Sequence, residues 1–227
     1  MRNVLHLFSV SLLASLSLAA WANGGGGMSR PSMPMPSHQA SPQEKARDAY
    51  NDGVRYVKKA DKAQQAANEA TDAGKKDKAG REAHDAYAAA LAKFTQSTSL
   101  DPSLHEAWNY VGYTNRKLGN YSDALTAYDK ALSIKPGYPD ALEYRGEAYL
   151  AVGRIPDAQQ AYLDLYGGNR ALAGKLLGAM KSWSAAQRAN PGASTNLDEL
   201  DKWIQERAQI AGQPAALTRE GTAASWR

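Results

Sequence analysis

Two short segments come close to the residue spacing of known catalytic motifs. His105-Glu106 begins as a zinc-protease helix does, but the second histidine required four residues after the first is missing. The segment 168–175 has the glycines and the lysine of a phosphate-binding loop, yet it has one intervening residue too many. Leu176 also stands where a hydroxyl would hold Mg²⁺. The chain contains no cysteine nucleophile either, and we therefore expect that it is not an enzyme.

A set of candidate metal ligands lies within residues 23–43. Its soft and borderline donors are Met28, Met33, Met35 and His38. Thioether clusters favour Cu(I) in oxidising compartments. Gly, Pro and Ser dominate the rest of this segment and no apolar periodicity is visible, which predicts a flexible tether. Copper binding by the tether is kept as an alternative, and no other cofactor is expected.

Residues 1–22 have the pattern of an export signal. Arg2 supplies the positive start, residues 4–19 are mainly apolar, and the small residues Ala20 and Ala22 flank a cleavage site after position 22. The apolar stretch is short and interrupted by serines, so we expect no stable membrane span. The sequence thus predicts a cleavable signal peptide and a mature chain that begins at Asn23.

The clearest pattern in the chain is an echo at a step of 34 residues. The first set of positions is Trp108, Gly112, Ala124, Tyr128, Ala131 and Pro136; the second is Leu142, Gly146, Ala158, Tyr162, Leu165 and Arg170. Three of these six positions recur identically, and two more keep an apolar residue. A period of this length is typical of a solenoid built from helix pairs. Small residues at 112 and 124 are expected to lie opposite each other and to let the paired helices approach.

This pattern resembles the tetratricopeptide repeat (TPR), whose units are pairs of antiparallel helices. The resemblance implies an all-α fold, a short α-α superhelix with units at residues 105–138 and 139–172. A divergent first unit at 44–104 contains Gly53, which lies 37 residues before Ala90, whereas Gly112 lies 12 before Ala124. We expect the 25 extra residues to extend an N-terminal helical hairpin with its tip at Gly74 to Gly80; the alternative is a frayed, alanine-rich stretch.

The repeat register is lost after the second clear unit. Residues 173–210 carry two further apolar stripes, and we expect them to form a pair of capping helices, the second of which starts at Asn196. Residues 211–227 are predicted to be a disordered tail. An export signal, the absence of cysteine and this repeat together resemble exported, periplasmic TPR proteins of bacteria. We therefore expect a periplasmic location, with secretion as the alternative.

The TPR resemblance also indicates where a partner would bind. In this family the first helix of each pair lines a concave groove for peptides, and here the residues not assigned to the core are Asn109, Tyr110, Tyr113, Arg116, Lys117, Glu143, Tyr144, Glu147 and Leu150. Tyrosines beside polar and charged residues suit recognition. Alternatively, these tyrosines pack between units. Some family members grip a terminal carboxylate with Lys, Asn and Arg on this face, and Glu143 and Glu147 argue against such a clamp.

Composition narrows the class of partner. The formal net charge is +4 and charges of both signs are interspersed, so no nucleic-acid stripe is present. We expect a non-catalytic adaptor or scaffold of the bacterial cell envelope that binds a protein or peptide in its groove. The alternatives are a self-associating structural protein, which would be a homo-oligomer, and the copper-binding tether.

Overall fold

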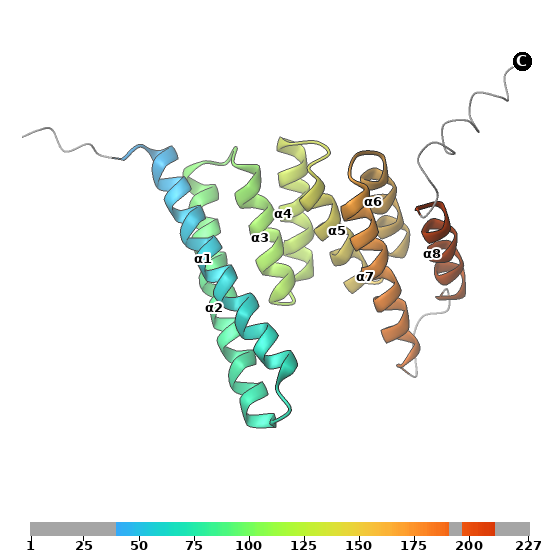
Figure 1. Ribbon diagram of the computed structural model, residues 1–227. Coiled ribbons are helices and arrows are strands. Elements are labelled where there is room, and N and C mark those ends of the chain that lie inside the picture. The colour runs from blue at the N-terminus through green and yellow to red at the C-terminus, as the bar shows by residue number, and fades with distance from the viewer. Residues whose placement is uncertain (1–39, 191–196, 212–227) are drawn as a thin grey trace, which may run out of the picture. The chain divides into compact units, whose positions relative to one another are not determined.

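The computed structural model describes residues 40–190 and 197–211, which form helices and no strands (Figure 1). Their bounds are α1 Pro42–Glu69, α2 Ala73–Leu100, α3 His105–Lys117, α4 Tyr121–Ile134, α5 Pro139–Ala151, α6 Ile155–Gly168, α7 Arg170–Arg188 and α8 Leu197–Ala211. Helices α1 and α2, α3 and α4, and α5 and α6 pack as consecutive pairs, and each pair contacts the next. Helix α7 packs on both α5 and α6, and α8 packs on α7. The predicted all-α, TPR-like solenoid is confirmed.

The first pair is the extended hairpin predicted by the insertion. Helices α1 and α2 have 28 residues each and run past the ends of α3 and α4 (Figure 1). Helix α1 begins two residues before the predicted boundary at 44, because Pro42 takes its first turn and Ser41 forms a capping box with Glu44. Buried alanines along both helices allow the close packing: Ala60, Ala67, Ala83, Ala86 and Ala90.

The predicted position of the hairpin tip is wrong. Gly74 and Gly80 both lie within α2, and the turn is made by residues 70–72. The cause is Asp72, whose side chain accepts a hydrogen bond from the backbone N–H of Lys75 and so starts the second helix early. Sequence reasoning gave the glycines too much weight as helix breakers.

Glycine permits close helix contacts in the two echoing units, but through different partners. A Cβ added at Gly112 would lie 2.5 Å from the ring of Tyr128 on α4, so this ring, rather than the predicted Ala124, is the nearest neighbour. A Cβ added at Gly146 would lie 2.6 Å from the side chain of Leu176 on α7. The sequence echo at these positions therefore does not produce an identical contact.

Helices α7 and α8 occupy the residues for which capping helices were predicted. Leu176 and Met180 of α7 and Leu200 and Ile204 of α8 are buried in the same core cluster as the side chains of α5 and α6. Trp203 contacts Tyr162 of α6, with ring centroids 5.2 Å apart. The predicted cap residue Asn196 lies outside the described residues.

Several sequence predictions fall on residues that the structure does not describe. These are the signal peptide, the methionine-containing tether up to residue 39, and the tail from residue 212. Among the described helices, none combines the length and apolar character needed for a membrane span.

Candidate functional site

The first helices of the pairs, together with α2 and α7, carry a group of charged and aromatic side chains, most of them partly exposed, that we call the central face. Its members are Asp61, Tyr87, Tyr110, Tyr113, Arg116, Lys117, Glu143, Tyr144, Glu147 and Lys175. Helices α3 and α5 contact each other here directly. The ring centroids of Tyr113 and Tyr144 lie 5.2 Å apart, and Arg116 forms a 2.6 Å ion pair with Glu147. The structure thus brings together side chains of α3 and α5 that were predicted to line one groove.

Aromatic contacts run continuously across the central face. Tyr110 stacks on the buried ring of Phe94 at 4.8 Å and lies 6.1 Å from Tyr113, edge to face. Tyr113 also contacts Tyr87 of α2. Tyr50 of α1 extends this series through edge contacts with Phe94 and Tyr110, both at 5.7 Å. Tyr110, Tyr113 and Tyr144 are each half-buried, so part of every ring packs between units and part remains accessible.

The cations of the central face lie against these rings. Arg116 is 5.5 Å from the ring centroids of both Tyr113 and Tyr144, and Lys117 is 5.5 Å from that of Tyr113. Burial and the neighbouring Arg116 lower the pKa of Lys117. Unlike Arg116, Lys117 forms no ion pair with any carboxylate of the described residues. It is therefore a cation that a bound partner could engage without first displacing a carboxylate.

The extended hairpin contributes a carboxylate to this face. Asp61 of α1 accepts hydrogen bonds from the hydroxyl groups of Tyr87, at 2.5 Å, and Tyr113, at 2.8 Å. Burial, followed by the hydrogen bond to Asp61, raises the pKa of both tyrosines well above the usual value. Because Asp61 joins α1, α2 and α3, it fixes the orientation of the Tyr113 ring.

Helix α7 supplies a lysine to the same face. The Lys175 ammonium lies 3.2 Å from the carboxylate of Glu143, whose side chain is 1% exposed, whereas the side chain of Lys175 is 55% exposed. Burial and the negative charge of Glu147 raise the pKa of Glu143 to about 7, although Lys175 opposes the shift. A carboxylate with this pKa changes charge near neutral pH.

Three residues predicted to be exposed on this face are buried. Asn109 is 2% exposed, Glu143 is fully buried, and Leu150 is 3% exposed. The prediction of exposure was wrong for all three. Glu143 and Leu150 lie on α5, which α7 covers in addition to α6, whereas Asn109 lies on α3, which packs against α2, α4 and α5. The side-chain oxygen Oδ1 of Asn109 is buried and has no hydrogen-bond partner within residues 40–190 and 197–211.

Sequence reasoning missed four members or neighbours of the face: Tyr50, Asp61, Tyr87 and Lys175. Tyr50 precedes Gly53 by three residues, as Asn109 precedes Gly112, so the repeat register applied to the first unit would have found it. Asp61 lies within the insertion and has no counterpart in the other units, whereas Tyr87 lies one 34-residue step before Tyr121, which was not a candidate site residue. Lys175 lies after the point where the repeat register is lost, so the sequence around it does not indicate that its side chain contacts α5.

The two near-catalytic segments take part in local contacts and in helix packing. His105 pairs with its neighbour Glu106, with Nδ1 3.0 Å from the carboxylate. Residues 168–175 span the end of α6 and the start of α7 rather than a loop after a strand, and Lys175 binds Glu143. Over residues 40–190 and 197–211, no group of three or more His, Asp or Glu side chains is placed to hold a metal ion. Met28, Met33, Met35 and His38 lie outside these ranges.

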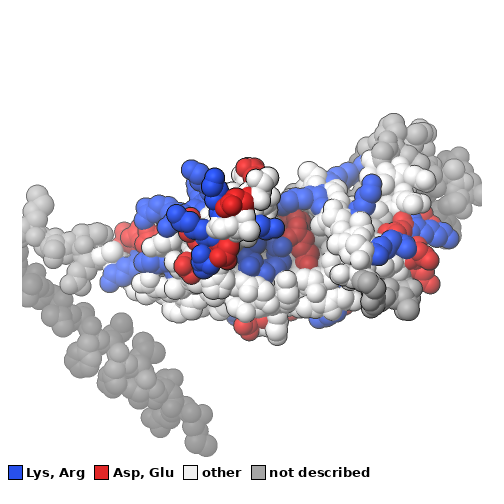
Figure 2. Space-filling view, turned by 90° about the horizontal axis from the view of Figure 1, so that it is seen from below, with Lys and Arg blue, Asp and Glu red and all other residues white. Residues whose placement is uncertain are grey.

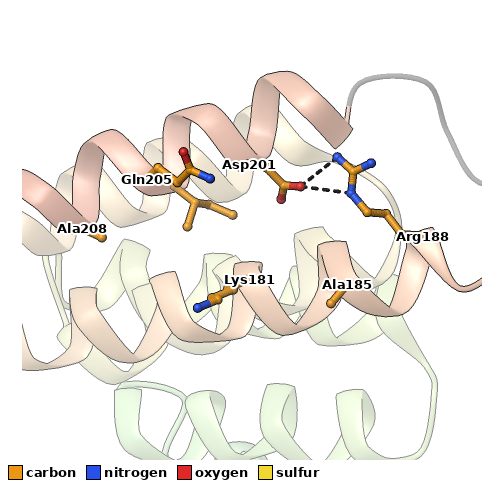
Figure 3. A pocket seen from close by; sticks show the side chains of 7 residues that line it. Lys181, Ala185, Arg188, Asp201, Gln205 and Ala208 are labelled. Atoms are coloured by element: carbon orange, nitrogen blue, oxygen red, sulfur yellow. Dashed lines mark hydrogen bonds and ion pairs between the residues drawn. The ribbon is translucent and has the colours of Figure 1, made fainter.

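A separate hollow lies between α7 and α8 (Figure 3). Within it Arg188 donates two hydrogen bonds to Asp201, from Nε at 3.0 Å and from Nη2 at 2.8 Å. Ser184 of α7 donates a third at 2.7 Å. All three hydrogen bonds connect α7 to α8. The polar groups of this hollow therefore hold the last helix in place, and we do not assign them to a binding site.

Charges of both signs cover the hairpin next to the central face. Figure 2 shows basic and acidic side chains mixed together over this part of the molecule. Several lie in local pairs, such as Arg81 with Asp77 and Arg55 with Asp52. Exposed pairs of this kind contribute little stability, and they give no uniform potential for a polyanion.

Comparison with known proteins agrees with the repeat pattern. Residues 112–153 match the family model described as TPR repeat. Among solved structures, a TPR2B-domain:pHsp70 complex of yeast Sti1 shows 17% identity and a TM-score of 0.38, covering 73% of this chain and 98% of that one. The first TPR of Spaghetti (RPAP3) bound to the HSP90 peptide SRMEEVD shows 20% identity and a TM-score of 0.39, covering 56% of this chain and 94% of that one. No curated protein sequence matches the chain significantly.

Proposed function

We propose that this chain is a non-catalytic protein-interaction module of the bacterial cell envelope, which binds a peptide segment of a partner protein across the central face. The single observation that carries the proposal is the convergence of α1, α3, α5 and α7 on this face. Together they present half-exposed tyrosines beside Arg116, Lys117 and Glu147. Rigid aromatic rings with polar rims supply contact area and hydrogen bonds at low entropic cost, which is typical of interaction hot spots.

The arrangement also favours binding over chemistry. The titratable groups of the central face are held in ion pairs, ring contacts and hydrogen bonds that link neighbouring helices, for example Arg116 with Glu147. Catalysis would instead require an acid, base or nucleophile aimed at a substrate position. A repeat of helix pairs displays a broad surface of this kind without needing an enclosed cavity.

The proposed location depends on the sequence of residues 1–22. Their charged start, apolar stretch and small residues before Asn23 are the features of a cleavable export signal. We expect the mature chain in the periplasmic fraction with Asn23 as its first residue. Cell fractionation followed by N-terminal sequencing measures this directly, and an intact N-terminus in the cytoplasmic fraction would contradict it.

A pair of photo-crosslinking positions tests the binding face. A photoreactive amino acid replaces Tyr144 on the central face or, as the matched control, Leu163 on α6, whose side chain is 45% exposed. In the native cells we expect position 144, and not position 163, to capture a distinct protein that mass spectrometry identifies. Equal capture at both positions, or capture at 163 alone, would exclude the central face. Capture of a second copy of this chain would favour the self-associating alternative.

A further inference from the structure

We infer that Glu143 and Lys175 form a proton-operated latch, through which mild acid makes the central face bind an acidic segment of the partner more tightly. This inference rests on the proposed function, because it concerns regulation of the same face. It goes beyond that function by naming the charge of the bound segment and the condition that strengthens binding.

The geometry separates a buried anion from an accessible cation. The Glu143 side chain is 1% exposed, and its Oε2 accepts a hydrogen bond from Lys175 at 3.2 Å. Its Oε1 lies 3.2 Å from the same ammonium and has no hydrogen-bond partner among the described residues. Lys175 is 55% exposed and comes from a different helix. When Glu143 is protonated, the attraction that holds the ammonium against α5 is lost, and the long lysine side chain is free to reach a ligand.

The titratable groups near Glu143 come from α3, α4, α7 and α5 itself. Helix α3 supplies Arg116 and Lys117, α4 supplies the hydroxyl of Tyr128, and α7 supplies Lys175. On α5 itself Glu147 lies one turn after Glu143 and pairs with Arg116 at 2.6 Å. The buried titratable side chain of α6, Tyr162, contacts Tyr166 and Trp203 instead. Glu147 is thus the group that most disfavours a second negative charge beside it.

Charge balance then determines which ligand benefits. With every group ionised, Asp61, Glu143 and Glu147 balance Arg116, Lys117 and Lys175. Protonation of Glu143 leaves one net positive charge, at a place where Lys117 already lacks a carboxylate partner among the described side chains. The pKa of Glu143, raised to about 7 by burial and by Glu147, places this change within an ordinary physiological range. An acidic segment is the ligand that such a change attracts.

Binding of two labelled octapeptides by the full chain tests the latch. One alternates Glu with Ala and the other alternates Lys with Ala, and fluorescence anisotropy measures both affinities at pH 6 and pH 8. We expect the acidic peptide to bind roughly three- to fivefold more tightly at pH 6, the effect of one additional exposed ion pair, and the basic peptide to show no such gain. Stronger binding of the basic peptide at pH 6, or no binding of the acidic one, would overturn the inference.

Three variants locate the titrating group. Glu143→Gln should bind the acidic peptide at pH 8 as tightly as the unaltered chain does at pH 6, with no further pH dependence. Lys175→Met should bind weakly at both pH values. His105→Gln, which removes the histidine at the start of α3 that pairs with Glu106, should retain the full response. An unchanged pH response in Glu143→Gln would contradict the latch.

A direct titration separates failure of the latch from failure of the proposed function. NMR of protein labelled at the glutamate side-chain carboxyls, with the Glu143 signal assigned by its absence in Glu143→Gln, should show a midpoint near neutral pH. A midpoint in the ordinary range of glutamate would overturn the latch alone. Crosslinking from position 144 does not depend on this titration, so loss of capture there would instead count against the binding face.

Discussion

The three N-terminal helix pairs use glycine in two different ways. In the first two pairs the glycine lies under an aromatic ring of its own partner helix: Gly53 under Phe94 and Gly112 under Tyr128. In the third pair Gly146 receives Leu176 of the following helix instead. Tyr162, which corresponds to Tyr128 in the repeat, is buried and contacts Tyr166 and Trp203. The glycine of the repeat therefore contacts the second helix of its own pair in the first two pairs. In the third pair it contacts α7, the helix that follows the pair.

This difference explains how the central face obtains its last cation. Lys175 immediately precedes Leu176, and Glu143 precedes Gly146 by one helical turn. Once Leu176 fits against Gly146, the lysine and the carboxylate are brought within 3.2 Å. The contact of Gly146 with Leu176 thus adds the pair of Lys175 and Glu143 to a face on which α3 and α5 already pair Arg116 with Glu147.

Gly112→Leu should give the largest loss of stability. The new side chain would have to displace the ring of Tyr128, which is fully buried and cannot move aside without disturbing α4. Overpacking of this kind costs about 1–3 kcal/mol, and we expect the upper end of that range. Thermal unfolding followed by circular dichroism measures it. A melting temperature equal to that of the unaltered chain would mean that α3 and α4 are not paired through this residue.

Gly146→Leu should cost less, because Leu176 is a flexible side chain that can rotate away. We expect a loss of roughly 1–2 kcal/mol, with faster hydrogen exchange concentrated in α7 rather than in α6. The double variant Gly146→Leu with Leu176→Ala should recover part of the loss, since truncation makes space for the new side chain. Additive losses in the double variant would show that the two residues are not in contact.

Glu143→Gln should change the pH dependence of stability. The pKa of Glu143 in the folded chain, about 7, is above its ordinary value of 4.5, so its contribution is complete at acidic pH and is lost as pH rises through about 7. The variant should therefore match the unaltered chain below pH 5 and exceed it by roughly 1–3 kcal/mol above pH 8. Chemical denaturation at several pH values gives this difference, and parallel curves for the two proteins would be evidence against the raised pKa.

Tyr113→Phe should have the smallest effect. It removes one hydrogen bond to Asp61 while leaving the ring contacts with Tyr87, Tyr110 and Tyr144 in place. A loss of about 1 kcal/mol is expected. Tyr121→Phe is the control, because the Tyr121 hydroxyl makes no hydrogen bond within the described part of the chain. If both variants lose the same free energy of unfolding, the hydrogen bond between Tyr113 and Asp61 does not stabilise the fold.

Much of the fold follows from periodicity. The 34-residue echo placed the two regular units, and the 25 extra residues between Gly53 and Ala90 gave the extended hairpin. Both depend on local patterns of apolar and small residues, which a single chain displays directly. The tip was misplaced because the N-cap at Asp72 starts α2 before the glycines, and capping by one aspartate is a weaker sequence signal than two glycines.

The site was less accessible to such reasoning. The TPR resemblance indicated that the first helices share one face, and Tyr113 and Arg116 of α3 do meet Tyr144 and Glu147 of α5, although no observation tests their role in binding. Spacing along one helix does not reveal what a later helix covers, however, so Glu143 and Asn109 were expected to be exposed. Lys175 depends on a tertiary contact between α5 and α7, which begins after the repeat register ends.

In the proposed function, the central face binds a partner and does not merely hold α3 against α5. The most direct test is an exchange of the ion pair between Arg116 and Glu147: Arg116→Glu, Glu147→Arg and the double variant. For each protein, the melting temperature is measured beside capture of the partner identified from position 144. Both single variants should lose stability and capture, because each leaves a half-buried charge facing a like charge. We predict that the double variant recovers most of the stability but not the capture; full recovery of both would show that the pair is structural and that the partner binds elsewhere.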